Sequence, residues 1–128
     1  MILLASTADG VFAVDLDTGE IDAGEPFEPE PPPRLNLPRV VAAAAAGSTV
    51  VAVVDARPPM LVSHDAGTTW RESGRGLAPG AAVAIAASNP DVLAYAARNR
   101  LYVSRDGGVF WSALAGELPR IEAVALRG

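Results

Sequence analysis

The sequence predicts an all-β protein built from three similar four-stranded antiparallel units. The main observation is a repeat: the segment SHDAGTTW at residues 63–70 recurs as SRDGGVFW at residues 104–111, with four identical residues each displaced by 41 positions. The second observation is that short β-rich runs alternate with Gly, Pro, Asn and Asp, which is the pattern of strands and turns. A period of about 40 residues indicates a repeat architecture in which each repeat is one supersecondary unit.

The composition favours a single cytoplasmic domain. The 128 residues are half apolar, which is enough for one core, and the absence of cysteine excludes disulfides and thiolate metal sites. Asp9 and Gly10 interrupt the apolar N-terminus, so it does not resemble a signal peptide, and no run reaches the roughly 18 apolar residues of a membrane span. The net charge of -5 argues against nucleic-acid binding. We expect no cofactor.

Four strands are expected in each unit. In the second unit they lie near residues 40–46, 49–55, 60–63 and 69–73, and in the third near residues 82–87, 92–97, 101–104 and 109–113. The first unit is split between the termini, with its first strand at residues 121–126 and the others near residues 2–7, 11–14 and 20–23. Alanine favours helix, but the alanine run before Gly47 is short and matches the β-leaning residues 83–86, so we expect a strand there.

The units are expected to form one domain over residues 1–128. The first comprises residues 1–35 and 119–128, the second residues 36–77 and the third residues 78–118. The turn at residues 15–19 keeps an aspartate and a glycine but lacks serine and tryptophan, so we interpret it as a degenerate copy of the motif. The alternative is a calcium loop, but the glycine is misplaced for an EF-hand and the twelfth position is not glutamate. We expect no metal.

Residues 63–70 and 104–111 resemble the Ser-x-Asp-x-Gly-x-Thr-Trp pattern of the BNR or Asp-box repeat, although Phe110 stands where the pattern prefers threonine. Through the period, the resemblance covers nearly all of the chain. It implies a β-propeller of the sialidase-like or sortilin-like kind, in which the box forms the turn between the third and fourth strands of a blade. The box implies a fold and not a reaction.

The residue types of the box predict a structural role. Short oxygen-bearing side chains can bind backbone amides in a tight turn, glycines can adopt positive φ, and tryptophan rings can pack between blades. His64, the only histidine, occupies a variable position of the first box and is expected at the surface. The structural residues are Ser63, Asp65, Gly67, Trp70, Ser104, Asp106, Gly108 and Trp111.

Three blades are too few to close a ring, because propellers have about 4 to 8. The bare end faces would expose apolar surface, and two-fold symmetry is the commonest way to cover such surface. We therefore expect a homodimer that forms one six-bladed ring. The strand at residues 121–126 follows the third blade, so it is expected to join the N-terminal sheet of the partner chain by reciprocal exchange.

Arginines gather on one side of the predicted ring, opposite the boxes. Guanidinium groups around a channel mouth can bind carboxylate or phosphate, so an anionic sugar or metabolite is a candidate ligand. The alternative is that these arginines are ordinary solvated loop residues. The loop arginines are Arg34, Arg39, Arg57, Arg75, Arg98, Arg100 and Arg120, and the proposed ligand-binding residues are Arg39, Arg57, Arg98, Arg100 and Arg120.

The acidic proline-rich segment at residues 25–33 is expected on the same side, stiff and extended. We interpret it as a connection between two blades. The alternatives are that it folds over the channel, that its glutamates pair with the arginines, or that it recruits a partner that recognises polyproline.

The sequence favours a non-catalytic binding or scaffolding protein over an enzyme. Sialidases with this repeat have a Phe/Tyr-Arg-Ile-Pro element, which is absent here, so Arg39 and Arg120 cannot be assigned to an arginine triad. The alternative is a glycoside hydrolase, which usually needs two carboxyl groups. The predicted channel strands supply only Glu122, which could pair with its copy in the partner chain as acid/base.

A binding groove between blades is a further possibility. It could be lined by Tyr95, Tyr102 or Phe27. Aromatic residues in strands are more often part of the core.

Overall fold

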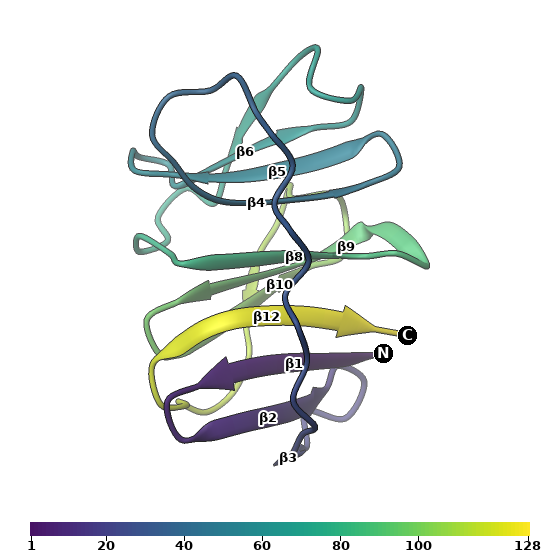
Figure 1. The fold of residues 1–128 in the computed structure, drawn as a ribbon, viewed down its shortest axis with the longest axis vertical. Coiled ribbons are helices and arrows are strands. Elements are labelled where there is room, and N and C mark those ends of the chain that lie inside the picture. Colours follow the sequence, from purple (N-terminus) through teal and green to yellow (C-terminus); the bar gives the residue numbers. More distant parts are fainter.

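A computed structural model describes residues 1–128 of the chain, with twelve strands and no helix (Figure 1). The strands form three four-stranded sheets in which neighbouring strands are antiparallel. The all-β class and the three antiparallel sheets predicted from the repeat are thereby confirmed. No helix long and apolar enough to span a membrane is present.

Each sheet is built from one repeat unit. Sheet A has the order β12-β1-β2-β3 and contains β12 (Ile121–Arg127), β1 (Ile2–Thr7), β2 (Gly10–Asp15) and β3 (Ile21–Ala23). Sheet B contains β4 (Val40–Ala46), β5 (Thr49–Val54), β6 (Met60–Ser63) and β7 (Arg71–Ser73), in sequence order. Sheet C contains β8 (Ala82–Ala86), β9 (Asn89–Ala97), β10 (Arg100–Ser104) and β11 (Ser112–Ala113), also in sequence order.

The alanine run before Gly47 forms a strand because its neighbours provide the pairing that a short segment lacks by itself. β4 pairs along its length with β5, whose six residues are all buried. β-branched valines suit a buried, pleated surface. The helix propensity of alanine is therefore overridden by the contacts of the sheet.

The three sheets are stacked in the order B, C, A along the long axis of the molecule (Figure 1). β8 contacts both β4 and β12, so the first strands of the three sheets lie next to one another. We call β4, β8 and β12 the inner strands; each is an edge strand of its own sheet.

Two apolar clusters hold the stack together. Between sheets B and C, Val53, Leu93 and Tyr95 belong to one buried cluster. Between sheets C and A, a larger cluster includes Leu3 and Ile121, which come from opposite ends of the chain. Sheet C is therefore covered on both faces, whereas sheets A and B each have one face without a neighbouring sheet.

The C-terminal strand pairs within the chain, and the expected exchange between two chains stays a prediction because the structure contains one chain. β12 pairs with β1 of the same chain over its whole length, with Leu3 opposite Leu126 and Ala5 opposite Val124. Sheet A lies next to sheet C in the stack. The chain therefore passes from β11 in sheet C directly into β12, which pairs with the N-terminal strand β1 in sheet A. In the single chain, sheet A is complete without a second copy.

Because β12 joins sheet A, the connection from sheet A to sheet B is long and crosses sheet C. Residues 24–39, which we call the strap, lead from β3 in sheet A past sheet C to β4 in sheet B (Figure 1). The two other connections between sheets join neighbours and need only residues 74–81 and 114–120. The proline-rich segment is thus a connection between two units, as interpreted from the sequence, but these units are not adjacent in the stack.

The outer strands β7 and β11 begin later than expected, at Arg71 and Ser112 instead of near residues 69 and 109. The reason is that aspartates of the preceding turns accept hydrogen bonds from the backbone amides of Thr69 and Phe110. Those amides are used within the turn and are not available for pairing with the neighbouring strand.

Leu93 provides a test of the cluster between sheets B and C, because it has no exposed surface. Leu93→Ala is expected to lower the free energy of unfolding by about 2–5 kcal/mol, since the neighbouring side chains cannot fill the cavity fully. Urea unfolding followed by circular dichroism measures this loss. Val109→Ala, at a side chain that is 67% exposed, serves as the control and should change stability by less than about 0.5 kcal/mol. Equal losses in both variants would contradict the assignment of this core.

Candidate functional site

The first box forms a tight turn between β6 and β7. The buried Ser63 Oγ accepts hydrogen bonds from the Gly67 amide at 2.8 Å and the Asp65 amide at 3.3 Å, and donates to Asp65 Oδ1 at 2.7 Å. Asp65 in turn accepts from the Thr69 amide at 2.8 Å and from the Thr69 hydroxyl at 2.6 Å. Gly67 has a φ of 89°, a region that side chains rarely enter.

The second box repeats this pattern between β10 and β11. Ser104 Oγ accepts from the Gly108 amide at 2.8 Å and the Asp106 amide at 3.5 Å, and donates to Asp106 Oδ1 at 2.8 Å. Asp106 accepts from the Phe110 amide at 3.0 Å. Phe110 has no hydroxyl to replace that of Thr69, and its side chain is 76% exposed. The turn is therefore kept by the serine and the aspartate, with one hydrogen bond fewer.

These hydrogen bonds stabilise the ionised aspartates. Donation by the Thr69 side chain and amide, together with Ser63, lowers the pKa of Asp65 to about 2. The pKa of Asp106 is also lowered, mainly by the Phe110 amide and by Ser104. Both carboxylates stay charged at neutral pH and are occupied within their own turns.

Trp111 connects two sheets. Its Nε1 donates to Ser73 Oγ at 2.9 Å, while the Ser73 hydroxyl donates to the Gly108 carbonyl at 2.6 Å. Its ring also lies edge-on to Tyr95, with centroids 6.0 Å apart. The half-buried Trp111 of sheet C thus packs against sheet B. Trp70 is the equivalent residue one repeat earlier and is also half-buried, but it is not part of the apolar cluster between sheets B and C.

Tyr95 is part of the core and not of a binding groove. Its ring is fully buried, and its hydroxyl donates to the Ala78 carbonyl at 2.6 Å. Burial, with a further contribution from Tyr102, raises the pKa of Tyr95 to about 12. The two rings lie with centroids 6.1 Å apart, so Tyr102 packs beside the same core.

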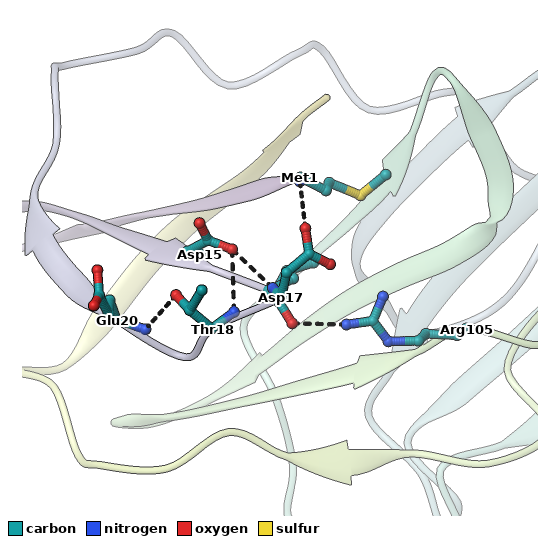
Figure 2. Close-up of polar contacts among 7 residues, drawn as sticks. Met1, Asp15, Asp17, Thr18, Glu20 and Arg105 are labelled. Atoms are coloured by element: carbon teal, nitrogen blue, oxygen red, sulfur yellow. Dashed lines mark hydrogen bonds and ion pairs between the residues drawn. The ribbon is translucent and has the colours of Figure 1, made fainter.

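The degenerate turn of sheet A uses its carboxylates for local contacts (Figure 2). Asp15 Oδ1 accepts from the amides of Asp17 and Thr18, and Asp17 lies 3.6 Å from the N-terminal ammonium group of Met1. Arg105 from the second box donates to the Leu16 carbonyl at 2.8 Å and ties this turn to sheet C. No group of three histidine, aspartate or glutamate side chains is arranged to hold a metal ion.

Two of the five proposed arginines lie around one hollow. Arg98, in the β9–β10 turn, and Arg120, just before β12, line an open hollow of about 550 Å³ together with Asn99, Leu118 and Pro119. Two backbone bonds join the segments that carry them: the Ile121 amide donates to the Arg98 carbonyl at 2.7 Å and the Leu118 amide to the Asn99 carbonyl at 3.0 Å.

Arg98 has a further unusual feature. Its φ is 58°, in the left-handed region that is uncommon for a residue with a side chain. Arg98 and Asn99 form the two-residue turn between the paired residues Ala97 and Arg100, and such turns take positive φ at one or both of their central positions. Neither Arg98 nor Arg120 takes part in an ion pair.

The other three arginines lie elsewhere. Arg100 forms an exposed ion pair with Glu117 at 3.6 Å. Arg39 is the last residue of the strap, just before β4, and Arg57 lies in the β5–β6 turn, and neither lines the hollow. The structure therefore does not gather all five into one site. The sequence did not single out Asn99, which lines the same hollow as Arg98 and Arg120.

The remaining candidates for catalysis do not form a catalytic group. His64 is exposed, and its Nδ1 lies 3.4 Å from Thr49 Oγ1. Glu122 is exposed on β12 and lines a separate cavity between the inner strands and the strap. Ser63 and Ser104 are occupied by the turn hydrogen bonds and have no adjacent histidine base in hydrogen-bond contact.

Comparison with protein-family models and with curated proteins gives no match for this chain. The function proposed below therefore depends on the residues and geometry described above.

Asp65 links the first box to acid stability. A carboxyl group whose pKa is lower in the folded state than in the unfolded state stabilises the fold above its unfolded pKa, and this contribution is lost as the pH falls. Since the pKa of Asp65 drops from 3.8 to about 2, the loss should fall between about pH 4 and pH 2. Asp65→Asn is therefore expected to show a shallower fall of unfolding free energy across this window than the original chain. Urea unfolding at stepped pH values measures the slopes. Asp9→Asn, in the exposed β1–β2 turn, is the control, and an unchanged slope in Asp65→Asn would contradict the role of this carboxylate.

Proposed function

We propose that the chain is one half of a six-bladed Asp-box β-propeller, formed by two copies, that binds ligands without catalysing a reaction. Three observations support the ring: the three sheets share one strand order, their inner strands lie side by side, and both box turns occur at the same point of their sheets. An arc of three such sheets needs further sheets to close, because propellers have about 4 to 8.

The end sheets support pairing with a second copy. In sheet A, Leu3 and Ala5 face sheet C, so the alternating Ile2 and Leu4 point to the opposite, uncovered side. In sheet B, all six residues of β5 are buried within the chain, and the exposed apolar side chains are those of Val40 and Val41 on β4. Both end sheets thus present small or medium apolar side chains, as expected for surfaces that pack together.

Trp70 supports the same assembly. Trp111, its equivalent one repeat later, packs against the sheet that precedes its own in the stack. No sheet precedes sheet B within one chain. In a two-chain ring, sheet A of the partner occupies that position and can receive Trp70. Each chain keeps its own β12 in this arrangement, so exchange of strands between chains is not required.

A single substitution on an end face tests the dimer. We expect the original chain to have the mass of two chains in light scattering coupled to size-exclusion chromatography. Leu4→Asp places a charge in the apolar interface, where burying it without a partner is costly, and should give the mass of one chain. Val109→Asp, at an exposed position of the second box, is the control and should keep the mass of two. A compact single-chain mass for the original chain would contradict the ring.

The hollow between Arg98 and Arg120 carries the proposal of ligand binding. Two guanidinium groups without carboxylate partners, beside the amide of Asn99, fit the oxygens of a carboxylate or phosphate group. We infer that this site recognises an anionic sugar or a similar metabolite.

Titration with glucose 6-phosphate and glucuronate tests this site, with glucose as the neutral control. The double variant Arg98→Ala/Arg120→Ala should bind the anions at least roughly tenfold more weakly, because each charge-assisted hydrogen bond contributes about 1.5–3 kcal/mol. Arg71→Ala, an exposed arginine at the start of β7, is the matched control. Equal binding of glucose, or anion binding unchanged in the double variant, would contradict the proposal.

The alternative of a glycoside hydrolase has less support. Glu122 shares its cavity with Glu28 and Glu30, but both of these lie on the strap. Residues 25–38 form no hydrogen bond or ion pair that would fix a second carboxylate at a defined distance from Glu122. Two carboxyl groups at a set separation are what glycosidase chemistry needs.

A further inference from the structure

A cavity lies between the strap and the inner strands. It has a volume of about 590 Å³, within the usual range of about 300–1,000 Å³ for small-molecule sites. Residues 28–33 of the strap form one wall, and β4, β8 and β12 form the other. The inner strands contribute mainly alanines, whose short side chains leave the space unfilled.

The strap is attached mainly at its ends. The Gly24 amide donates to the Val11 carbonyl at 2.8 Å, and the Arg39 carbonyl accepts from the Asp55 amide at 3.0 Å. Between these points, residues 25–38 form no hydrogen bond and no ion pair with the rest of the chain. Four apolar side chains of the strap are half-buried, namely Phe27, Pro33, Leu35 and Leu37, so opening the strap breaks apolar contacts but no hydrogen bond of residues 25–38. Segments with few fixed contacts open at a lower free-energy cost than the core strands. A ligand can therefore enter without disrupting the sheets.

The charges of the cavity define the polarity of its ligand. Glu28 and Glu30 face it from the strap and Glu122 from β12, whereas Arg127 is the only basic residue in its lining. None of these four side chains takes part in an ion pair. Apolar strand residues and an excess of carboxylates fit a molecule with an apolar body and a cationic end, since opposite charges attract each other.

The lining also distinguishes between kinds of cation. It contains no phenylalanine, tyrosine or tryptophan. Quaternary ammonium groups are typically recognised by aromatic rings, whereas primary amines can donate hydrogen bonds directly to carboxylates.

We propose that the cavity between the strap and the inner strands binds an aliphatic primary amine, with its chain on the alanine-rich wall and its ammonium group at the carboxylates of the lining, which come from Glu122 on β12 and from Glu28 and Glu30 on the strap. This site is separate from the anion site at Arg98 and Arg120, because the two share no residue. Its ligand has the opposite charge, so each site can be tested without the other.

Titration of the full chain with octylamine at neutral pH tests the proposal, with octanoate and 1-octanol as controls of equal chain length. Calorimetry gives the affinity, and the amide signals of Glu28 and Glu30 in nuclear magnetic resonance spectra report on the strap. We expect octylamine to bind and to shift these signals. Both controls should bind at least roughly tenfold more weakly, because neither can donate charge-assisted hydrogen bonds from an ammonium group.

Two kinds of variant locate the site. Glu122→Gln and the double variant Glu28→Gln/Glu30→Gln should each weaken octylamine binding, whereas Glu72→Gln, an exposed glutamate on β7, should not. Ala45→Trp fills the cavity from an exposed position of β4 and should abolish binding while the circular dichroism spectrum is unchanged. The proposal is overturned if octylamine does not bind, if octanoate binds equally well, or if Glu72→Gln weakens binding as much as Glu122→Gln.

Discussion

The pairing of β12 with β1 is the contact on which the rest of the molecule depends. It joins the two ends of the chain into one sheet and places Ile121 and Leu126 in the same core as Leu3. Because this sheet follows sheet C in the stack, the chain that leaves β3 must return past sheet C to reach β4. The course of the strap, and with it the cavity under the strap, is a consequence of closing the ends of the chain on each other.

The box turns determine where each sheet ends and how it meets its neighbour. A buried serine and an ionised aspartate satisfy the amides of each turn, so the turn has a defined shape without contributions from other sheets. This shape holds Gly108 and Trp111 against Ser73 of the adjacent sheet. Trp70, the equivalent of Trp111 one repeat earlier, has no preceding sheet within the chain to pack against, and the proposed second copy would supply one.

The two hollows of the molecule have opposite chemistry. The one beside Asn99 combines two arginines without acidic partners, whereas the one under the strap combines three glutamates with a wall of alanines. In a ring of two chains, each site would occur twice.

The sequence by itself determined the local structure. The repeat at residues 63–70 and 104–111 predicted the three four-stranded units and their strands to within a few residues, because serine, aspartate and glycine at these spacings satisfy a turn from within. Tertiary structure decided the features that depend on the relative positions of distant segments. It paired β12 with β1 of the same chain, brought Arg98 and Arg120 together while leaving Arg39 apart, and laid the proline-rich strap over the inner strands. A local pattern carries no information about which sheets become neighbours, since that order is set by burial of apolar faces across the whole stack.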